Sequence, residues 1–197
     1  MAAPSVQPVI DALRKNRAVF EKFCRSLSKE ELERPVPPDN KWTVKDFIIH
    51  NLTFDDLTVE WAENVMAGNT AAPADPNGGA FNVDAWNQER VEQWRGKTLD
   101  EVFAASVPER VKFEAALSRL TDADTQQIVE FPGDNKRDPA KVQFGLFLHG
   151  LARHDPIHAA DMLKALPERA SDPELKAWLD DRMVEWYQQA MSGPAKR

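Results

Sequence analysis

Cysteine, basic clusters and long apolar runs are scarce in this chain of 197 residues, and each scarcity excludes a class of protein. The single cysteine, Cys24, leaves no internal disulfide, no cysteine zinc cluster and no redox pair. Its apolar neighbours favour a small core residue over a nucleophile. The longest apolar stretch, 142–152, contains Gln143 and His149 and falls short of the roughly 20 residues that span a bilayer. We therefore expect no membrane partner.

The charge balance is acidic, and it argues against a nucleic-acid partner. The chain has 25 lysines and arginines against 32 aspartates and glutamates, a net charge of −7. The basic residues are interspersed with acidic ones, whereas phosphate recognition requires a clustered basic face. The first residues lack the basic-then-apolar pattern of a secretory signal, which predicts a cytoplasmic protein. Six tryptophans and ten phenylalanines supply bulk for a sizeable core.

Helix signals dominate the chain, and runs of alternating β-branched residues are nearly absent. Four segments open on a capping box, in which a Ser or Thr hydroxyl accepts from a backbone amide and the acid three residues later bonds back. Two further segments place an acidic cap before a proline, which suits the first helical position. The boxes begin at Ser28, Thr43, Thr98 and Thr121, and the acid–proline pairs are Asp138-Pro139 and Asp172-Pro173.

Connectors rich in proline and glycine divide these segments, and a long one spans 68–79. The pattern predicts an all-α protein, a four-helix bundle with a long crossover from 68 to about 95 between its second and third long helices. An extra C-terminal helix follows the bundle. The expected helices lie near 5–26, 43–67, 82–95, 98–120, 139–166 and 172–191.

Two units are expected: the bundle at 1–167 and a C-terminal helical extension at 168–197. The extension carries an apolar stripe, which predicts that it packs on its own bundle or on a second subunit. Packing on a second subunit would make the protein a homodimer. The stripe consists of Leu175, Trp178, Leu179, Met183 and Trp186.

Three of the four histidines fall on apolar helix faces. In the helix expected from residue 43, His50 shares its face with Phe54. In the helix expected from residue 139, His154 and His158 lie four residues apart on the apolar face. His149 lies five residues before His154, which is about 140° around the helix, and should face elsewhere. His50, His154 and His158 are therefore predicted to meet inside the bundle.

Three converging imidazoles suit a metal ion. Two imidazoles at positions i and i+4 lie about 5–6 Å apart at Cβ, and a third from a facing helix completes three nitrogen ligands. Such a set suits Zn²⁺ or Ni²⁺ and leaves a coordination position for water or substrate, whereas a structural zinc site is closed by four protein ligands. The alternative is that these are hydrogen-bonded core histidines, because an HxxxH pattern alone has little specificity.

Two stretches resemble a known family. Residues 41–52, KWTVKDFIIHNL, are similar to the opening of the second helix in the DinB-like superfamily, and residues 153–162, RHDPIHAADM, resemble the HDxxH motif of its fourth helix. The segment 81–87 is similar to the crossover of many members. The resemblance covers about residues 5–166 and implies a four-helix bundle with a three-histidine metal site. Carried onto this sequence, the metal ligands are His50, His154 and His158.

Pro156 departs from a regular helix, because a proline removes an amide donor and clashes with the preceding turn. The helix is expected to kink at 152–156 or to restart with Asp155 as its cap. Three acids are candidates for proton transfer or for a hydrogen bond to the ring nitrogen of a ligand imidazole that faces away from the metal. They are Asp46, Asp155 and Asp161. Asp46 is better explained as the capping acid of its own helix, and the other two also fit a solvated surface.

The superfamily includes thiol-dependent transferases and isomerases of the mycothiol-dependent maleylpyruvate isomerase type. The resemblance implies a metal-dependent transferase, isomerase or hydrolase acting on a small molecule, with a water or a thiol cofactor activated by the ion. Trp86 and Asn87 are candidates for the mouth of its pocket, and Trp86 also fits a packing anchor. No general base stands out, so catalytic residues stay unassigned. The alternative is a non-catalytic bundle that binds a metal or small ligand or assembles with a partner.

Overall fold

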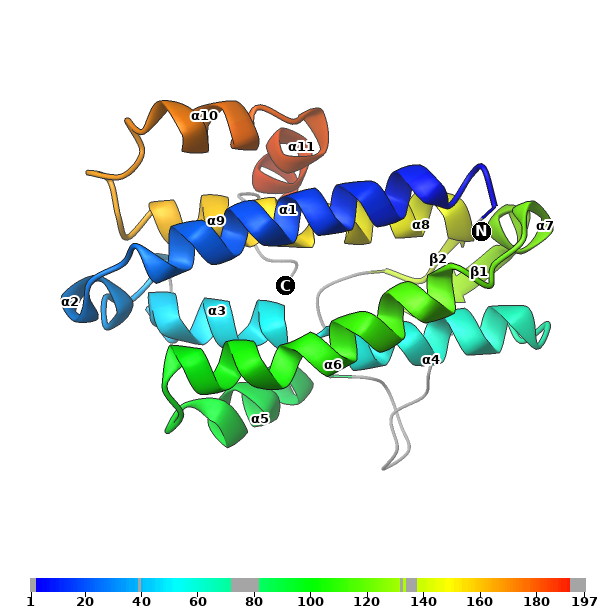
Figure 1. Ribbon diagram of the computed structural model, residues 1–197, viewed down its shortest axis with the longest axis horizontal. Coiled ribbons are helices and arrows are strands. Elements are labelled where there is room, and N and C mark those ends of the chain that lie inside the picture. The colour runs from blue at the N-terminus through cyan, green and yellow to red at the C-terminus, as the bar shows by residue number, and fades with distance from the viewer. Residues whose placement is uncertain (1–2, 39, 72–81, 132, 134–137, 192–197) are drawn as a thin grey trace.

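Four helical rods run alongside one another near the long axis of the molecule in the computed structural model (Figure 1). The structure describes residues 3–38, 40–71, 82–131, 133 and 138–191. The protein is an all-α four-helix bundle, as predicted, and its second and fourth rods are each built from two helices. The rods are α1 (Gln7–Arg25), α3 (Val44–Leu52) with α4 (Asp55–Met66), α6 (Leu99–Leu117), and α8 (Phe144–Leu151) with α9 (His154–Leu163).

Shorter helices lie at both ends of the bundle and on two of its sides (Figure 1). The described residues at the end of the crossover form α5, packed against α3. Two single-turn helices lie at opposite ends of the bundle, and two more helices follow α9 (Figure 1). These elements are α2 (Lys29–Leu32), α5 (Val83–Trp94), α7 (Asp122–Gln126), α10 (Pro173–Leu179) and α11 (Arg182–Met191).

The helix expected over 139–166 begins later than predicted, because a small sheet precedes it. Strands β1 (Ile128–Phe131) and β2 (Ala140–Gln143) pair antiparallel, with Val129 opposite Val142. Val129 is buried in the core, so burial of this side chain favours the strand pairing. The backbone N–H of Phe144 then donates to the Gln127 carbonyl at 2.8 Å, and α8 starts at this point. The interpretation of Asp138-Pro139 as a helix start was therefore wrong.

The predicted capping boxes form. At each of them the hydroxyl accepts from the backbone N–H three residues later, and the acid there accepts from the cap residue's own N–H. Asp172 caps α10 by accepting from two backbone amides, with Pro173 in the first turn, as expected. The four boxes begin at Ser28, Thr43, Thr98 and Thr121.

Two rods are interrupted where the sequence predicts continuous helices. The helix expected over 43–67 breaks at Thr53, whose hydroxyl donates to the Ile49 carbonyl at 2.9 Å. The fourth rod breaks at Ala152 and restarts after Arg153, which occupies the N-cap position of α9. Pro156 then lies in the first turn, where its missing N–H disturbs no helical hydrogen bond. The restart at this point was predicted, but its cap is Arg153 and not Asp155.

The core consists of two hydrophobic clusters, one toward each end of the bundle. Every rod contributes side chains to both clusters, so a layer between them crosses all four rods. Cys24 lies in the first cluster, which confirms it as a core residue. On the four rods in order, the first cluster includes Phe20, Leu52, Phe103 and Ala159, and the second includes Leu13, Trp61, Phe113 and Ala152.

The layer between the clusters is charged. Each rod places one largely buried residue of an ion pair between the apolar positions, and these residues pair across the bundle. Arg17 binds Asp155 with two contacts, at 2.8 and 3.1 Å, and Arg110 Nε lies 2.9 Å from Asp55 Oδ2. All four side chains are at most 13% exposed. We refer to Arg17, Asp55, Arg110 and Asp155 as the buried charge layer.

The segment after the fourth rod folds back along the bundle, with α10 and α11 against α9 (Figure 1). Of its predicted apolar stripe, Leu175 is buried, Trp178, Leu179 and Met183 are half-buried, and Trp186 is exposed. Trp178 Nε1 donates to Asn16 Oδ1 of α1 at 3.0 Å. The predicted single helix over 172–191 is thus two helices, both of which pack on the bundle of the same chain.

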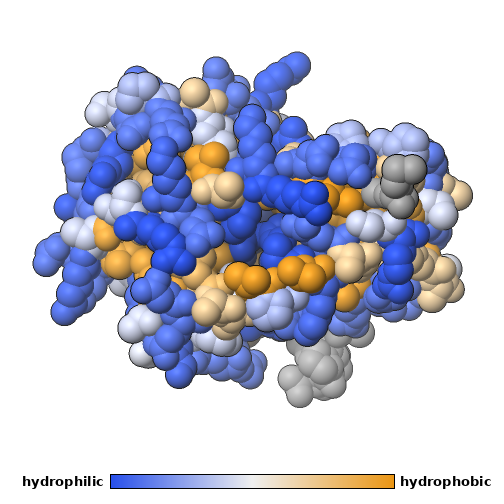
Figure 2. All heavy atoms as spheres, viewed as in Figure 1, coloured by the Kyte–Doolittle hydropathy of each residue, from blue (hydrophilic) through white to orange (hydrophobic). Residues whose placement is uncertain are grey.

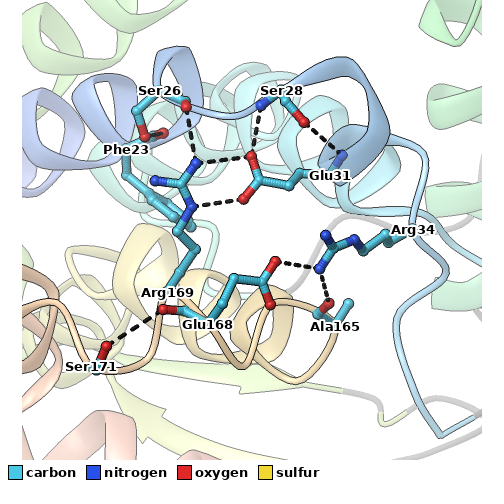
Figure 3. Close-up of polar contacts among 9 residues, drawn as sticks. All are labelled: Phe23, Ser26, Ser28, Glu31, Arg34, Ala165, Glu168, Arg169 and Ser171. Atoms are coloured by element: carbon cyan, nitrogen blue, oxygen red, sulfur yellow. Dashed lines mark hydrogen bonds and ion pairs between the residues drawn. The ribbon is translucent and has the colours of Figure 1, made fainter.

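Ion pairs on the surface hold the turn after α1 to the turn after α9 (Figure 3). Arg169 binds both carboxylate oxygens of Glu31, at 2.7 and 2.9 Å, and Arg34 pairs with Glu168 and donates to the Ala165 carbonyl. Glu31 is buried, but Arg169, Arg34 and Glu168 are open to solvent, so each contact is worth about 1 kcal/mol or less.

The face that carries α1 and α6 is mostly hydrophilic, and apolar side chains form a narrow strip along α6 (Figure 2). Val107 and Val111, one helical turn apart on α6, are the exposed large apolar residues of that helix, at 60% and 62%. None of the described helices is both long enough and apolar enough to span a bilayer.

Candidate metal centre

His50, His154 and His158 come together in the interior, near the breaks in the second and fourth rods. One ring nitrogen from each of the three lies within 4.8 Å of the others. The ring centroids are 5.1 Å apart for His50 and His154, 5.0 Å for His50 and His158, and 4.6 Å for His154 and His158. His149, which was predicted to face elsewhere, is not part of this group. We refer to His50, His154 and His158 as the histidine cluster.

Burial favours the neutral form of two of the three imidazoles. His50 is 6% exposed and His158 is 9% exposed, and His154 is half-buried. Desolvation, followed by the neighbouring imidazoles, lowers the pKa of His50 and of His154 well below 6.5. Neutral imidazole is the form that binds a metal ion, so both residues are ready to act as ligands at neutral pH.

Asp161 fixes the orientation of His158. Its Oδ2 lies 3.0 Å from His158 Nδ1, one helical turn further along α9. Burial opposes ionisation of Asp161, but the hydrogen bond with His158 and the ammonium group of Lys164 lower its pKa to about 2. An ionised carboxylate only accepts hydrogen bonds, so Nδ1 of His158 carries the proton and the lone pair of Nε2 is free for an ion. Of the two roles considered for Asp161, the structure shows the contact with the imidazole.

Aromatic rings enclose the cluster. Phe54 stacks on His154 at 4.7 Å and contacts His50 at 6.0 Å. Trp42 lies 5.3 Å from His50, and Phe47 lies 5.6 Å from His158. Phe54 is the first residue after the break at Thr53, and it is the N-cap residue of α4. The break therefore brings an aromatic ring against two of the three imidazoles.

The other candidate acids have different partners. Asp46 caps α3 and accepts from Arg95, at 2.9 and 3.2 Å, so both of its oxygens are engaged. Asp155 belongs to the buried charge layer and binds Arg17. The expectation that Asp46 is the capping acid is confirmed, and the solvated surface considered for Asp155 is wrong, because this side chain is buried.

A cavity of about 480 Å³ lies where α5 and α6 meet the end of α3. Leu52, Trp86, Trp94 and Ser106 are among the residues that line it, together with the guanidinium of Arg90. Arg90 stacks over Trp86 at 4.2 Å and donates to the Thr53 carbonyl at 2.8 Å. The volume of the cavity falls within the range of small-molecule pockets, about 300–1,000 Å³. Trp86 lines the cavity, as considered from the sequence, whereas Asn87 does not.

The cavity lies close to the histidine cluster. Trp86, on its wall, contacts Phe54 at 6.1 Å between ring centroids, and the same phenylalanine stacks on His154. Arg90 is also near enough for its charge to contribute to the lowered pKa of His50, after burial and His158. Phe54 thus lies between Trp86 on the wall of the cavity and His154 of the histidine cluster.

Sequence reasoning missed two residues of the centre, and both come from α11. Gln188 Nε2 donates to Asp161 Oδ1 at 3.0 Å, and the Tyr187 ring meets the His158 ring at 6.1 Å. The only signal in the sequence was the apolar stripe of the extension. That stripe predicted packing against a surface, but it named neither the surface nor these two side chains.

The fold and the cluster define a class: a helical bundle with an interior group of three histidines that can hold a metal ion. A sequence model of the DinB superfamily matches residues 12–162, and the chain belongs to that superfamily. The match contains all three histidines and ends before α10 and α11. No curated protein matches the chain.

Proposed function

We propose that the protein is a metal-dependent enzyme that acts on a small molecule, with one divalent ion held by His50, His154 and His158. The observation that carries the proposal is the convergence of three ring nitrogens within 4.8 Å. A core histidine is normally satisfied by a donor or acceptor of another kind, whereas three imidazoles facing one another satisfy a cation best.

The donor set favours Zn²⁺ or Ni²⁺. Imidazole nitrogens suit both ions, and ligand distances of about 2.0–2.1 Å are expected for zinc. Among the residues that the structure describes, the histidine cluster offers three ligands and no fourth. Three protein ligands are typical of catalytic sites, because the remaining position is available for water or substrate.

A bound ion would supply Lewis acidity, lowering the pKa of a coordinated water or thiol. The chain itself supplies orientation and exclusion of solvent. Asp161 holds His158, and the rings of Trp42, Phe47 and Phe54 limit the access of water to the imidazoles. The neighbouring cavity gives a small substrate or thiol cofactor a place to bind. These features support a thiol-dependent transferase or isomerase, or a hydrolase.

The proposal is tested by loading the protein with Co²⁺ and titrating it with a low-molecular-weight thiol. A thiol that takes the open position forms a thiolate–Co²⁺ bond, which gives a charge-transfer band in the near ultraviolet. Loss of this band in His154→Ala would place the ion at the histidine cluster. If one Co²⁺ binds per chain but the band does not appear, a thiol-dependent transferase is excluded and a hydrolase remains. A shell closed by four protein ligands, measured by X-ray absorption, contradicts the enzyme and favours a binding module.

A further inference from the structure

The C-terminal helix α11 lies against the histidine cluster, although it is outside the residues that the family's sequence model matches. Its two contact residues are adjacent: Tyr187 meets the His158 ring, and Gln188 reaches Asp161. Both side chains are half-buried, so this part of α11 is covered by the bundle.

Gln188 makes two contacts with α9, one on each side of His158. Its Nε2 donates to the Ile157 carbonyl at 3.2 Å and to Asp161 Oδ1 at 3.0 Å. Asp161 Oδ2 meets His158 Nδ1, so one oxygen of this carboxylate holds the imidazole while Gln188 and Lys164 hold the other. With both oxygens engaged, the carboxylate has little freedom to rotate away from His158.

The beginning of α11 is anchored separately. Asp181 accepts from Arg153 at 3.1 Å and from the backbone N–H of Met183 at 2.8 Å. Arg153 is the N-cap residue of α9 and immediately precedes His154. Val184, one turn later, is 3% exposed. The position of Gln188 over Asp161 is therefore determined by an ion pair and an apolar contact that do not involve the histidine cluster.

We propose that α11 contributes to the metal centre through Gln188, which acts as a positioning residue. Gln188 holds Asp161, and Asp161 in turn holds His158 in its metal-binding orientation. This inference rests on the metal site proposed above. Residues that orient metal ligands through such contacts typically contribute about 10- to 100-fold in metal affinity. Because Lys164 still holds Asp161 when Gln188 is removed, we expect an effect at the lower end of this range.

The test compares Gln188→Ala with Gln189→Ala in the full-length protein. Gln189 is the next residue on α11 and is exposed, so it offers a matched control of the same residue type. Zn²⁺ affinity, measured by competition with a chromophoric chelator, should fall about 10-fold in Gln188→Ala and stay unchanged in Gln189→Ala. Asp161→Asn should lose more affinity than Gln188→Ala.

A purely structural role for Gln188 predicts a different result. Gln188→Ala would then lower the thermal midpoint, while the folded protein would bind Zn²⁺ as tightly as the parent, and the proposal would be overturned. If the parent itself binds no metal, the proposed function fails first, so the two failures are distinguishable.

A second measurement needs no substitution at Gln188. Tyr187 is the only tyrosine in the chain, so protein labelled with 3-fluorotyrosine gives a single ¹⁹F signal. Co²⁺ in the histidine cluster should shift and broaden this signal, and diamagnetic Zn²⁺ should shift it far less. A signal that stays in place while one Co²⁺ binds per chain would show that α11 lies away from the centre.

Discussion

The buried charge layer and the histidine cluster are neighbours, since His154 and Asp155 are consecutive, but their polar groups have different partners. In the charge layer each guanidinium meets a carboxylate, as Arg17 meets Asp155. In the histidine cluster the imidazoles face one another, with the single carboxylate of Asp161 on the outer side of His158. Both groups lie in the same bundle, the charge layer across all four rods and the histidine cluster between the second and the fourth.

This difference indicates a structural role for the charge layer and a metal-binding role for the histidine cluster. The charge layer brings its own opposite charges, so each buried ion has a counter-charge within the chain. The histidine cluster brings three imidazole donors and no cation, and therefore gains favourable contacts only when an ion is supplied. We therefore expect stability to depend mainly on the buried charge layer, and metal binding to depend on the histidine cluster.

The largest expected effect is on stability, in the charge layer. Arg17→Met leaves Asp155 buried without its partner, which should lower the free energy of unfolding by about 3–5 kcal/mol. Arg14→Met on the same helix is the control, because Arg14 is 60% exposed and its pair with Glu114 is worth about 1 kcal/mol or less. Urea denaturation of both variants measures the contrast. Equal losses would show that the charge layer is not the structural region.

The histidine cluster should affect stability only through the ion. Zn²⁺ at 100 times its dissociation constant should raise the free energy of unfolding of the parent by about 2.7 kcal/mol. His50→Ala, measured by the same denaturation, should show no such increase. A variant that is stabilised by Zn²⁺ as much as the parent would mean that the ion binds elsewhere.

The pH dependence of stability in the metal-free protein further distinguishes the histidine cluster from the charge layer. The pKa of His50 and of His154 is lowered in the folded state, so below about 6.5 the unfolded chain takes up protons that the folded chain does not. Stability should therefore fall as pH falls, by about 2 kcal/mol for the two residues between pH 6.5 and 5.5. The double variant His50→Gln/His154→Gln should lose this slope in denaturation curves. A parent curve that is flat over this interval would show that burial does not keep these imidazoles neutral.

The smallest effect concerns the surface contact between Arg169 and Glu31. Arg169→Gln should cost about 1 kcal/mol or less at neutral pH, because the arginine is 36% exposed. The hydrogen bonds from Arg169 lower the pKa of Glu31 to about 2, against the opposing effect of burial. The contact therefore stabilises above pH 4.5 and is lost as pH falls toward 2. Thermal midpoints of variant and parent should converge over this interval, and a constant difference would contradict the assignment.

The sequence predicted those features that depend on local chemistry. Thr43 and Asp46 form a capping box from residues three apart, so the start of α3 follows from its own sequence. The inward face of His154 and His158 follows from helical spacing in the same way. The break at Thr53 was missed, because neither glycine nor proline marks it. The sheet was missed for two reasons. Its strands have only four residues each, and Asp138-Pro139 matches the pattern of a helix start.

Apart from the meeting of the three histidines, the contacts between distant segments were not predicted. Asp161 is close to His158 in sequence, but its spacing fits an exposed acid equally well. Gln188 lies 27 residues beyond Asp161, and only the fold of α10 and α11 brings the two together. The partner of Asp155 is likewise 138 residues away, on α1. Pairing of this kind is decided by tertiary packing, which a periodic pattern does not encode.

The metal content of four alanine variants tests the central claim most directly. Each protein is reloaded with Zn²⁺ or Ni²⁺, freed of excess metal and analysed for ions per chain. The parent and His149→Ala should each retain one ion, and His50→Ala, His154→Ala and His158→Ala should retain none, because each of these loses one of three ligands. A parent that binds no ion, or a His149→Ala variant that loses it as completely as the others, would contradict a metal centre formed by these three histidines.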